Sequence, residues 1–254
     1  ATRFKTAVSK AGDDRRMHFS HHPDLWQAYP QLVAGVARVE GVDGLGDTAP
    51  AAEAHLAATR QRLEAALGNE SAEGSWPEIQ AWRRVFSQMG EKPTQVRCAA
   101  EALLRRLRKE GTLPRLHPLI DLCNALSVRF AVPVAVFDMA EVAWPMQVRH
   151  ATGDERYLSF GGEVEQPQPR EIIFADAAGQ AHARRWAHRQ SGASAIRAQT
   201  RSALIVAEAH HATAAESIEA LLTQLEHDLR LAGCAGVASA TLSAERAVFT
   251  LAEM

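Results

Sequence analysis

The chain has 254 residues, of which 46% are hydrophobic and 23% charged, and its formal net charge at pH 7 is −2. A chain of this length and composition can bury a core, and it lacks the run of about 18 apolar residues that a membrane-spanning helix requires. Its three cysteines are widely spaced and its first residues do not resemble an export signal. We therefore expect a soluble protein of the reducing cytoplasm, without a disulfide framework.

Positive charge is concentrated in two stretches of the chain. Residues 83–115 hold nine Lys or Arg and three Asp or Glu, a local charge of +6, and residues 184–201 hold five Arg and no acid. Such segregation is typical of a surface that binds a polyanion. The alternative is a solvated helix face with structural arginines, and charge alone favours this alternative.

The first half of the chain is predicted to be mainly helical. Residues 1–24 are polar and irregular. His18, His21 and His22 lie close together, but no spaced Cys or carboxylate accompanies them, so we predict no metal site. Alternation predicts an early strand over 32–42, and helical spacing of apolar residues predicts helices over 51–67, 77–90 and 94–110. We interpret Trp82, on the apolar face of the second helix, as a core residue and not as a stacking platform.

Four cations crowd the last two turns of the predicted helix over 94–110. They are Arg105, Arg106, Arg108 and Lys109. Cations at a helix C-terminus offset the helix dipole, and this explains part of the cluster without any ligand. Contact with the phosphates of RNA is the other interpretation.

Residues 114–138 are predicted to form a helix that leads directly into a strand. Apolar residues at three- and four-residue steps form one stripe, Pro118 suits the first helical turn, and Pro133 ends the helix. A short buried strand follows and closes at Asp138. Asn124, within the helix, and Asp138 are candidates to face one cleft. The alternative is that Asn124 caps a neighbouring backbone group and Asp138 starts a turn.

The second half is predicted to be rich in strands. Short runs at 146–150, 157–160, 170–175, 181–186 and 247–251 are typical of antiparallel strands, and 176–179 is a hairpin turn. Residues 201–210 form the most apolar run and are predicted to be a central strand, before a last amphipathic helix over 213–231. Gly161, Gly162 and Glu163 form a loop that suits either a close approach to a ligand or a tight turn. The order of elements predicts one α+β domain over residues 1–254, helical to about residue 110, with a mostly antiparallel sheet flanked by helices.

The stretch Arg184–Ser191, RRWAHRQS, combines arginines with an aromatic ring. As a strand it would place Arg184, Trp186 and His188 on one face and Arg185 and Arg189 on the other. Arginines interleaved with an aromatic ring can hold phosphates and stack on a nucleotide. The same arginines can equally pair with surface acids.

The sequence resembles a known family at several of these places. The run DLCNALSVRFAVPVAVFD is similar to the B3/B4 domain of the phenylalanyl-tRNA synthetase beta subunit, and more similar to free-standing B3/B4-domain proteins. The free-standing proteins also share a series of residues that occurs here in the same order: Trp82, Arg83, Gly90, Lys92, Pro93 and then Ala99–Arg106. Further matches are Gly161–Glu163, Glu171 with Asp176, Arg185-Trp186 with Arg189-Gln190-Ser191, and the strand that carries Glu208.

The resemblance implies a B3/B4-like fold and a trans-acting hydrolase that deacylates mischarged aminoacyl-tRNA. Such an enzyme needs no cofactor, metal or covalent nucleophile, because the ester is already reactive and a positioned water suffices. Its partner would be the acceptor end of tRNA, with no DNA and no membrane, and its oligomeric state is not predicted. The resemblance implies the following site: catalytic Asn124, Asp138, Gln190 and Glu208; substrate-binding Gly161, Gly162, Glu163, Trp186 and Ala135; RNA-binding Arg105, Arg106, Arg108, Lys109, Arg184, Arg185 and Arg189.

The sequence also departs from the synthetase pattern. Many synthetase domains have a histidine at the position of Ala135, and Glu208 does not fall squarely on the glutamate that reads the tyrosine hydroxyl. Removal of tyrosine from phenylalanine tRNA is therefore not implied. Two alternatives stay open: a non-catalytic module that binds tRNA or an amino acid, and a hydrolase of another small acyl ester, which would leave the basic stretches unexplained.

Overall fold

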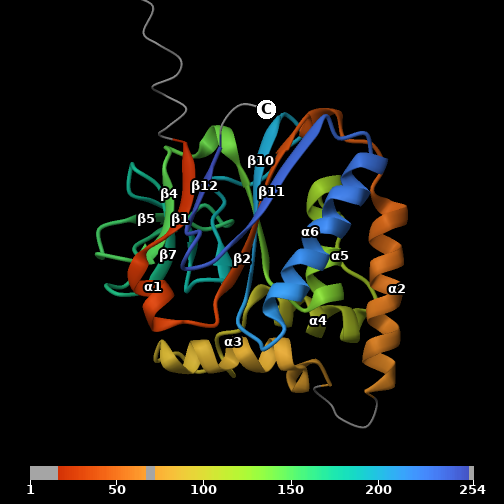
Figure 1. The fold of residues 1–254 in the computed structure, drawn as a ribbon, viewed down its shortest axis with the longest axis horizontal. Coiled ribbons are helices and arrows are strands. Elements are labelled where there is room, and N and C mark those ends of the chain that lie inside the picture. The colour runs from red at the N-terminus through yellow and green to blue at the C-terminus, as the bar shows by residue number, and fades with distance from the viewer. Residues whose placement is uncertain (1–16, 67–71, 252–254) are drawn as a thin grey trace, which may run out of the picture.

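The computed structural model describes residues 17–66 and 72–251, and its fold is α+β with three layers. Within these residues the strands form an eight-stranded sheet and a four-stranded sheet. Figure 1 shows the eight-stranded sheet on the left, the four-stranded sheet in the middle and helices α2, α5 and α6 on the right. The predicted fold class is confirmed: most strand pairings are antiparallel, and β1 with β4 and β5 with β8 are the parallel exceptions among the described strands.

The four-stranded sheet carries the predicted central strand. Its order is β11-β2-β10-β3, and all its described pairings are antiparallel. The apolar run at 201–210 forms β10, an inner strand of this sheet, as predicted. The bounds are β2 (Val33–Glu40), β3 (Val134–Asp138), β10 (Ser202–Ala209) and β11 (Gly236–Leu242), the last of which the sequence did not predict.

The eight-stranded sheet follows the order β12-β1-β4-β7-β8-β5-β6, and β9 pairs with β8. Part of the segment that was expected to be irregular forms β1, which lies between β12 and β4 in this sheet. The residues that follow β1 begin helix α1. The bounds are β1 (His18–His21), β4 (Met146–His150), β5 (Arg156–Leu158), β6 (Val164–Glu165), β7 (Ile172–Ala175), β8 (Gln180–Arg184), β9 (Arg189–Gln190) and β12 (Val248–Thr250). The rest of the predicted irregular segment, residues 1–16, lies outside the described residues.

The predicted helices form close to their expected bounds. In α5, Pro118 occupies the first turn and the His117 side chain accepts a hydrogen bond from the Leu119 amide, so the start was predicted correctly. Helix α4 begins five residues later than predicted, at Ala99. The bounds are α1 (Pro23–Ala28), α2 (Ala49–Ala65), α3 (Pro77–Gln88), α4 (Ala99–Glu110), α5 (Pro118–Phe130) and α6 (Ala214–Leu231).

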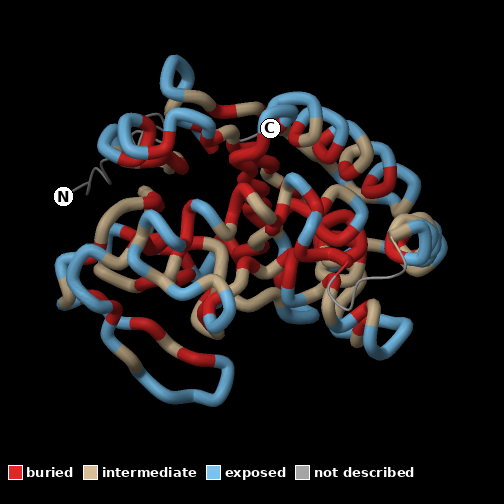
Figure 2. The backbone as a smooth tube through the Cα atoms, turned by 90° about the horizontal axis from the view of Figure 1, so that it is seen from below, coloured by how far each residue is buried: buried red, intermediate tan, exposed pale blue. Residues whose placement is uncertain are grey.

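Alternation along β10 divides the interior into two cores. Ala203, Ile205 and Ala207 pack with α5 and α6, whereas Leu204 and Val206 pack toward the eight-stranded sheet. Figure 2 shows the buried backbone in the middle of the molecule and exposed residues on its outer turns. Because side chains alternate with a period of two, the residue that follows Leu204 and Val206 on this side is Glu208. Its carboxylate therefore lies between the sheets.

Candidate functional site

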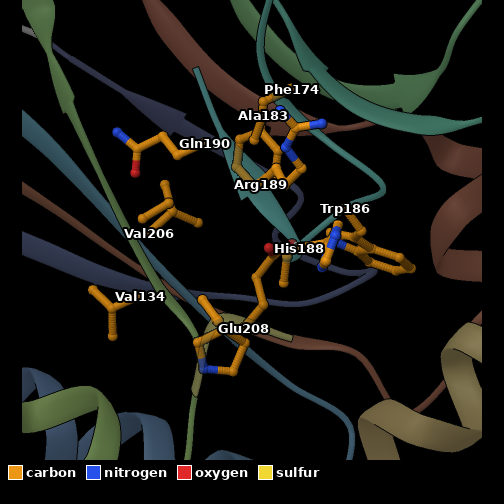
Figure 3. A pocket seen from close by; sticks show the side chains of 13 residues that line it. Val134, Phe174, Ala183, Trp186, His188, Arg189, Gln190, Val206 and Glu208 are labelled. Carbon is orange, nitrogen blue, oxygen red and sulfur yellow. The ribbon is translucent and has the colours of Figure 1, made fainter. Parts of the chain in front are cut away.

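A small pocket opens between the two sheets. We call it the intersheet pocket; the empty space in it and at its mouth, open solvent included, is about 370 Å³. Strands β3 and β10 form one wall, and the chain from β8 to β9 forms the other, as Figure 3 shows for Val134 and Val206 opposite Trp186 and Arg189. It is lined by Ala99, Pro133, Val134, Ala135, Phe174, Ala183, Trp186, Ala187, His188, Arg189, Gln190, Val206 and Glu208.

Glu208 is the one carboxylate among the described residues that line the intersheet pocket. It is only 3% exposed, and two donors hold it: His21 Nε2 donates to Oε1 over 2.6 Å, and Trp186 Nε1 donates to the same oxygen over 2.9 Å. Trp82 Nε1 donates to the Glu208 carbonyl oxygen over 3.2 Å. These bonds fix one carboxylate oxygen, while the described residues offer no donor to Oε2.

Trp186 reaches Glu208 through an unusual turn. Arg185 and Trp186 have φ angles of 48° and 55°, in the left-handed region that side chains disfavour. Two hydrogen bonds hold this turn: the Arg185 amide donates to Glu171 Oε1 over 2.9 Å, and the Trp186 amide donates to the Ile172 carbonyl over 2.7 Å. The predicted strand over 181–186 therefore ends at Arg184, and the expected alternation of side chains to residue 189 is wrong.

A layer of rings supports the floor of the pocket. Trp186 is completely buried and meets Trp82, Tyr29 and His210 edge-on, at ring-centroid distances of 5.4, 4.9 and 5.1 Å. Burial lowers the pKa of His210 to about 3, with a smaller contribution from nearby histidines, so its imidazole is neutral at physiological pH. Trp82 is thus a core residue, as predicted. This packing supports the side chain of Trp186, which donates to Glu208.

Two predicted catalytic residues lie elsewhere. Asn124 lines a separate groove formed by α2, α5 and the loop before α5. Asp138 Oδ2 accepts a hydrogen bond from Thr200 Oγ1 over 2.6 Å, and its Oδ1 caps the turn at Ala140 over 3.0 Å. The expectation that both face one cleft is wrong, and the alternative of a turn at Asp138 describes the structure. Asn124 lies on the side of α5 that is turned to α2, and Asp138 lies at the end of β3. Closeness in sequence therefore does not place the two side chains in one cleft.

Gln190 and Ala135 do lie at the intersheet pocket. Gln190 Nε2 donates to the Val136 carbonyl over 2.5 Å and its Oε1 accepts from the Val136 amide over 3.4 Å. The side chain therefore joins β9 of one sheet to β3 of the other at the pocket wall. Ala135, on β3, lines the same pocket.

The Gly161–Glu163 loop does not line the intersheet pocket. It turns between β5 and β6, where the Gly162 amide donates to the Ser159 carbonyl and the Ser159 amide donates to the Glu163 carbonyl over 3.0 and 2.8 Å. The three residues are exposed. Of the two interpretations of this loop, the tight turn fits the structure.

Most of the predicted RNA-binding arginines pair with acids. Arg184, 8% exposed, binds both Glu165 and Glu171, and Arg108 binds the buried Glu73 at 2.8 Å. Ion pairs to Glu91, Glu110 and Glu165 also engage Arg185, Arg106 and Arg189, at 3.4, 2.9 and 3.2 Å. Arg105 and Lys109 make no ion pair with a described residue. Charge in the stretch 184–201 is therefore largely structural, whereas five of the nine cations in 83–115 make no ion pair with a described residue. Arg189 stays 44% exposed at the pocket mouth.

His188 is a pocket residue to which the sequence assigned no role. Its Nδ1 lies 2.7 Å from the Arg97 carbonyl oxygen, and its ring lines the intersheet pocket. His21 was likewise considered only as a metal ligand, and the structure places it on Glu208. Within 17–66 and 72–251 no group of three or more His, Cys, Asp or Glu side chains is arranged to hold a metal ion.

Ser194, His182 and Asp176 form a chain that resembles a catalytic triad in composition. His182 Nδ1 lies 2.8 Å from Ser194 Oγ, and its Nε2 lies 3.1 Å from Asp176 Oδ2. Ser194 and His182 are completely buried. A substrate carbonyl cannot reach the buried Ser194 hydroxyl. We therefore interpret these three hydrogen-bonded side chains as structural support for the β7–β8 hairpin and the segment after β9.

Comparison with known proteins identifies the family. The B3/4 domain family matches residues 81–228. The phenylalanine–tRNA ligase beta subunit of Haemophilus influenzae is 31% identical over 74 residues, and that of Shewanella oneidensis 34% identical over 73 residues. These matches cover 29% and 28% of this chain but only 9% of each relative's length.

Among solved structures, an N-terminal fragment of the phenylalanyl-tRNA synthetase beta subunit from Pyrococcus horikoshii is similar at 13% identity. The TM-score is 0.39, and the match covers 47% of this chain and 41% of that chain. None of the helices in the described part of the chain meets the length and hydropathy required to cross a membrane. The family match covers more than half of the chain, so the chain belongs to the B3/4 domain family.

Proposed function

We propose that this protein deacylates mischarged aminoacyl-tRNA, and that the intersheet pocket receives the amino acid. The observation that carries the proposal is a buried carboxylate, Glu208, in a small and otherwise mainly apolar pocket. The family supports it, because the relatives are beta subunits of a tRNA ligase. The pocket between the sheets suits one aminoacyl group better than a whole nucleotide.

The lining of the pocket suits the two ends of an amino acid. Phe174, Val134 and Val206 offer apolar surface to a side chain, and burial of an apolar group contributes about 25 cal/mol per Å². The Glu208 carboxylate, with Oε2 free of described donors, offers a charged acceptor to the α-ammonium group. An isolated ammonium ion in such a site would be strongly disfavoured without this partner.

The ester itself requires little further chemistry. It is activated, so holding the acyl group and positioning one water accounts for a large part of the rate enhancement. The acceptor end of the tRNA would lie at the pocket mouth, where Arg189 is half exposed and only weakly held by Glu165, at 3.2 Å. Arg105 and Lys109, on the helix whose first residue lines the pocket, provide additional positive charge.

The experiment that tests this function is a panel of mischarged tRNAs. Each carries a different amino acid, and release of the amino acid by the purified protein is compared with the spontaneous rate. We expect turnover for a subset with small or medium apolar side chains, and loss of turnover in Ala135→Leu, which fills the pocket. Asn124→Ala is the matched control and should keep the wild-type rate, because Asn124 lies in another groove. No turnover above the spontaneous rate for any member would refute the proposal.

A second candidate is an amino-acid-binding module without chemistry. The observation that favours it is the pairing of most candidate RNA-binding arginines with acids, which leaves few cations free for phosphate. The same pairing weakens an objection to a hydrolase of another acyl ester, since the arginines of 184–201 no longer require RNA. Free amino acid that binds in calorimetry, with neither salt-sensitive tRNA binding nor turnover, would favour the binding module.

A further inference from the structure

We propose that His188 is the general base that removes a proton from the water attacking the aminoacyl ester. This inference rests on the proposed deacylase function. His188 would touch the reacting water, and neither the sequence nor the family motif assigned a role to its side chain.

The first support is position. His188 lines the intersheet pocket together with Glu208, the carboxylate that would hold the ammonium group. Its ring comes from the segment between β8 and β9, so it stands on the wall opposite Val134 and Val206 (Figure 3). An ester carbonyl attached to the bound α-carbon would lie within the same small pocket, within reach of a water on this wall.

The second support is the hydrogen bond at Nδ1. A backbone carbonyl oxygen can only accept, so Nδ1, at 2.7 Å from the Arg97 carbonyl, must carry the proton. In the neutral ring Nε2 then bears the lone pair. No described residue donates to or accepts from Nε2, and it is not among the buried polar atoms without a partner. A water can therefore approach it.

The third support is the charge state of the ring. Burial lowers the pKa of His188, and the hydrogen bond to the Arg97 carbonyl opposes part of this effect. The positive charges of Arg185 and Arg189 lower the pKa further, and Glu91 raises it slightly. Glu208 and Arg189 are the other ionisable groups that line the pocket. The pKa of His188 therefore lies below the ordinary histidine value of about 6.5, so at neutral pH the ring is present as the free base.

The step balances as an ordinary ester hydrolysis. Nε2 takes one proton from water while the oxygen attacks the carbonyl carbon and forms a tetrahedral oxyanion. When this collapses, the bond between the acyl carbon and the ribose oxygen breaks. The imidazolium then returns its proton to the ribose oxygen, which leaves a free amino acid and tRNA with its terminal hydroxyl restored.

The test compares wild type with His188→Asn on a tRNA that the wild type deacylates. The amide nitrogen of Asn can still donate to the Arg97 carbonyl, so the local fold is kept, but no base stands at the Nε2 position. We expect kcat to fall by about 10²–10⁴ with KM nearly unchanged. In wild type kcat/KM rises with pH to a plateau, with its inflection below pH 6.5, and His188→Asn loses this acidic limb. Imidazole added to His188→Ala should restore part of the rate.

His150→Asn is the matched control. His150 also holds its Nδ1 on a backbone carbonyl, that of Arg170 at 2.9 Å, but it lines a different groove. It should keep the wild-type rate. A nitrogen-15 spectrum of the histidine rings provides a readout without turnover and should show the Nδ1–H tautomer for His188 at neutral pH.

The outcomes separate this inference from the function on which it depends. An active wild type with an equally active His188→Asn overturns the role of His188 alone, and so does an Nε2–H tautomer. An equal loss in His150→Asn also overturns it. A wild type without turnover on any mischarged tRNA overturns both the role of His188 and the deacylase function.

Discussion

Substitution of Glu208 separates its structural role from its functional one. In Glu208→Ala the donors His21 Nε2 and Trp186 Nε1 both lose their acceptor, and each belongs to a residue no more than 2% exposed. In Glu208→Gln the amide oxygen can still accept from both donors. The amide nitrogen then takes the place of Oε2, for which the described residues offer no donor. The two variants thus differ in stability but share the loss of the charge.

The magnitudes follow from the number of orphaned donors. A buried donor without an acceptor costs about 1–3 kcal/mol, so two of them lower the free energy of unfolding of Glu208→Ala by roughly 2–6 kcal/mol. Glu208→Gln should stay within about 1 kcal/mol of wild type. Loss of the carboxylate that holds an ammonium ion costs about 2 kcal/mol or more in transition-state binding, which is roughly a 30-fold or greater drop in kcat/KM.

Urea unfolding followed by tryptophan fluorescence measures the first quantity, and deacylation of a mischarged tRNA measures the second. Glu219→Gln, on the exposed face of α6, is the matched control and should change neither. A Glu208→Ala protein as stable as wild type would show that the hydrogen bonds to His21 and Trp186 do not hold the pocket floor. A Glu208→Gln enzyme with wild-type kcat/KM would refute the proposal that the negative charge of Glu208 holds the ammonium group.

Two further predictions concern charges away from the pocket. Arg108→Ala leaves the buried Glu73 carboxylate without its cation, 2.8 Å away, and should lower the free energy of unfolding by about 3 kcal/mol, whereas Arg105→Ala should lower it by less than about 0.5 kcal/mol in the same urea experiment. Equal effects would contradict the structural role assigned to Arg108. Burial opposes ionisation of Glu155, but hydrogen bonds from the Thr152 and Gly153 amides and from Arg149 outweigh it and lower its pKa to about 2. Because the folded-state pKa lies below the unfolded value of about 4.5, this stabilisation is present above pH 4.5 and is lost as the pH falls toward 2. Glu155→Gln should therefore lose on the order of 3 kcal/mol at neutral pH and less at pH 2–3, and a loss independent of pH would contradict the assignment.

Local patterns explain the parts of the fold that the sequence predicted. Helix α5 begins at Pro118 because a proline in the first turn gives up no helical hydrogen bond, and its apolar stripe buries Leu119, Leu122 and Leu126. Strand β10 is recognisable because its run of apolar residues faces a core on each side. The strands β1 and β11 were missed because their residues are mostly small or polar, and pairing with neighbours stabilises them.

The site depends more on tertiary contacts than on local pattern. The left-handed turn at Arg185 and Trp186 is held by Glu171 and Ile172, more than ten residues earlier, and nothing in RRWAHRQS requires it. Asn124 and Asp138 are close in sequence, yet they face different surroundings. Glu208 was named through the resemblance alone, and alternation along β10 explains why its side chain lies between the sheets.

The most direct test of the central claim is a crystal structure with a non-hydrolysable aminoacyl adenosine, in which an amide replaces the ester. We expect the side chain of the amino acid between Val206 and Trp186, its ammonium group on Glu208, and the adenosine at the mouth near Arg189. Density for the aminoacyl group in another groove, such as the one lined by Asn124, with the intersheet pocket empty, would contradict it.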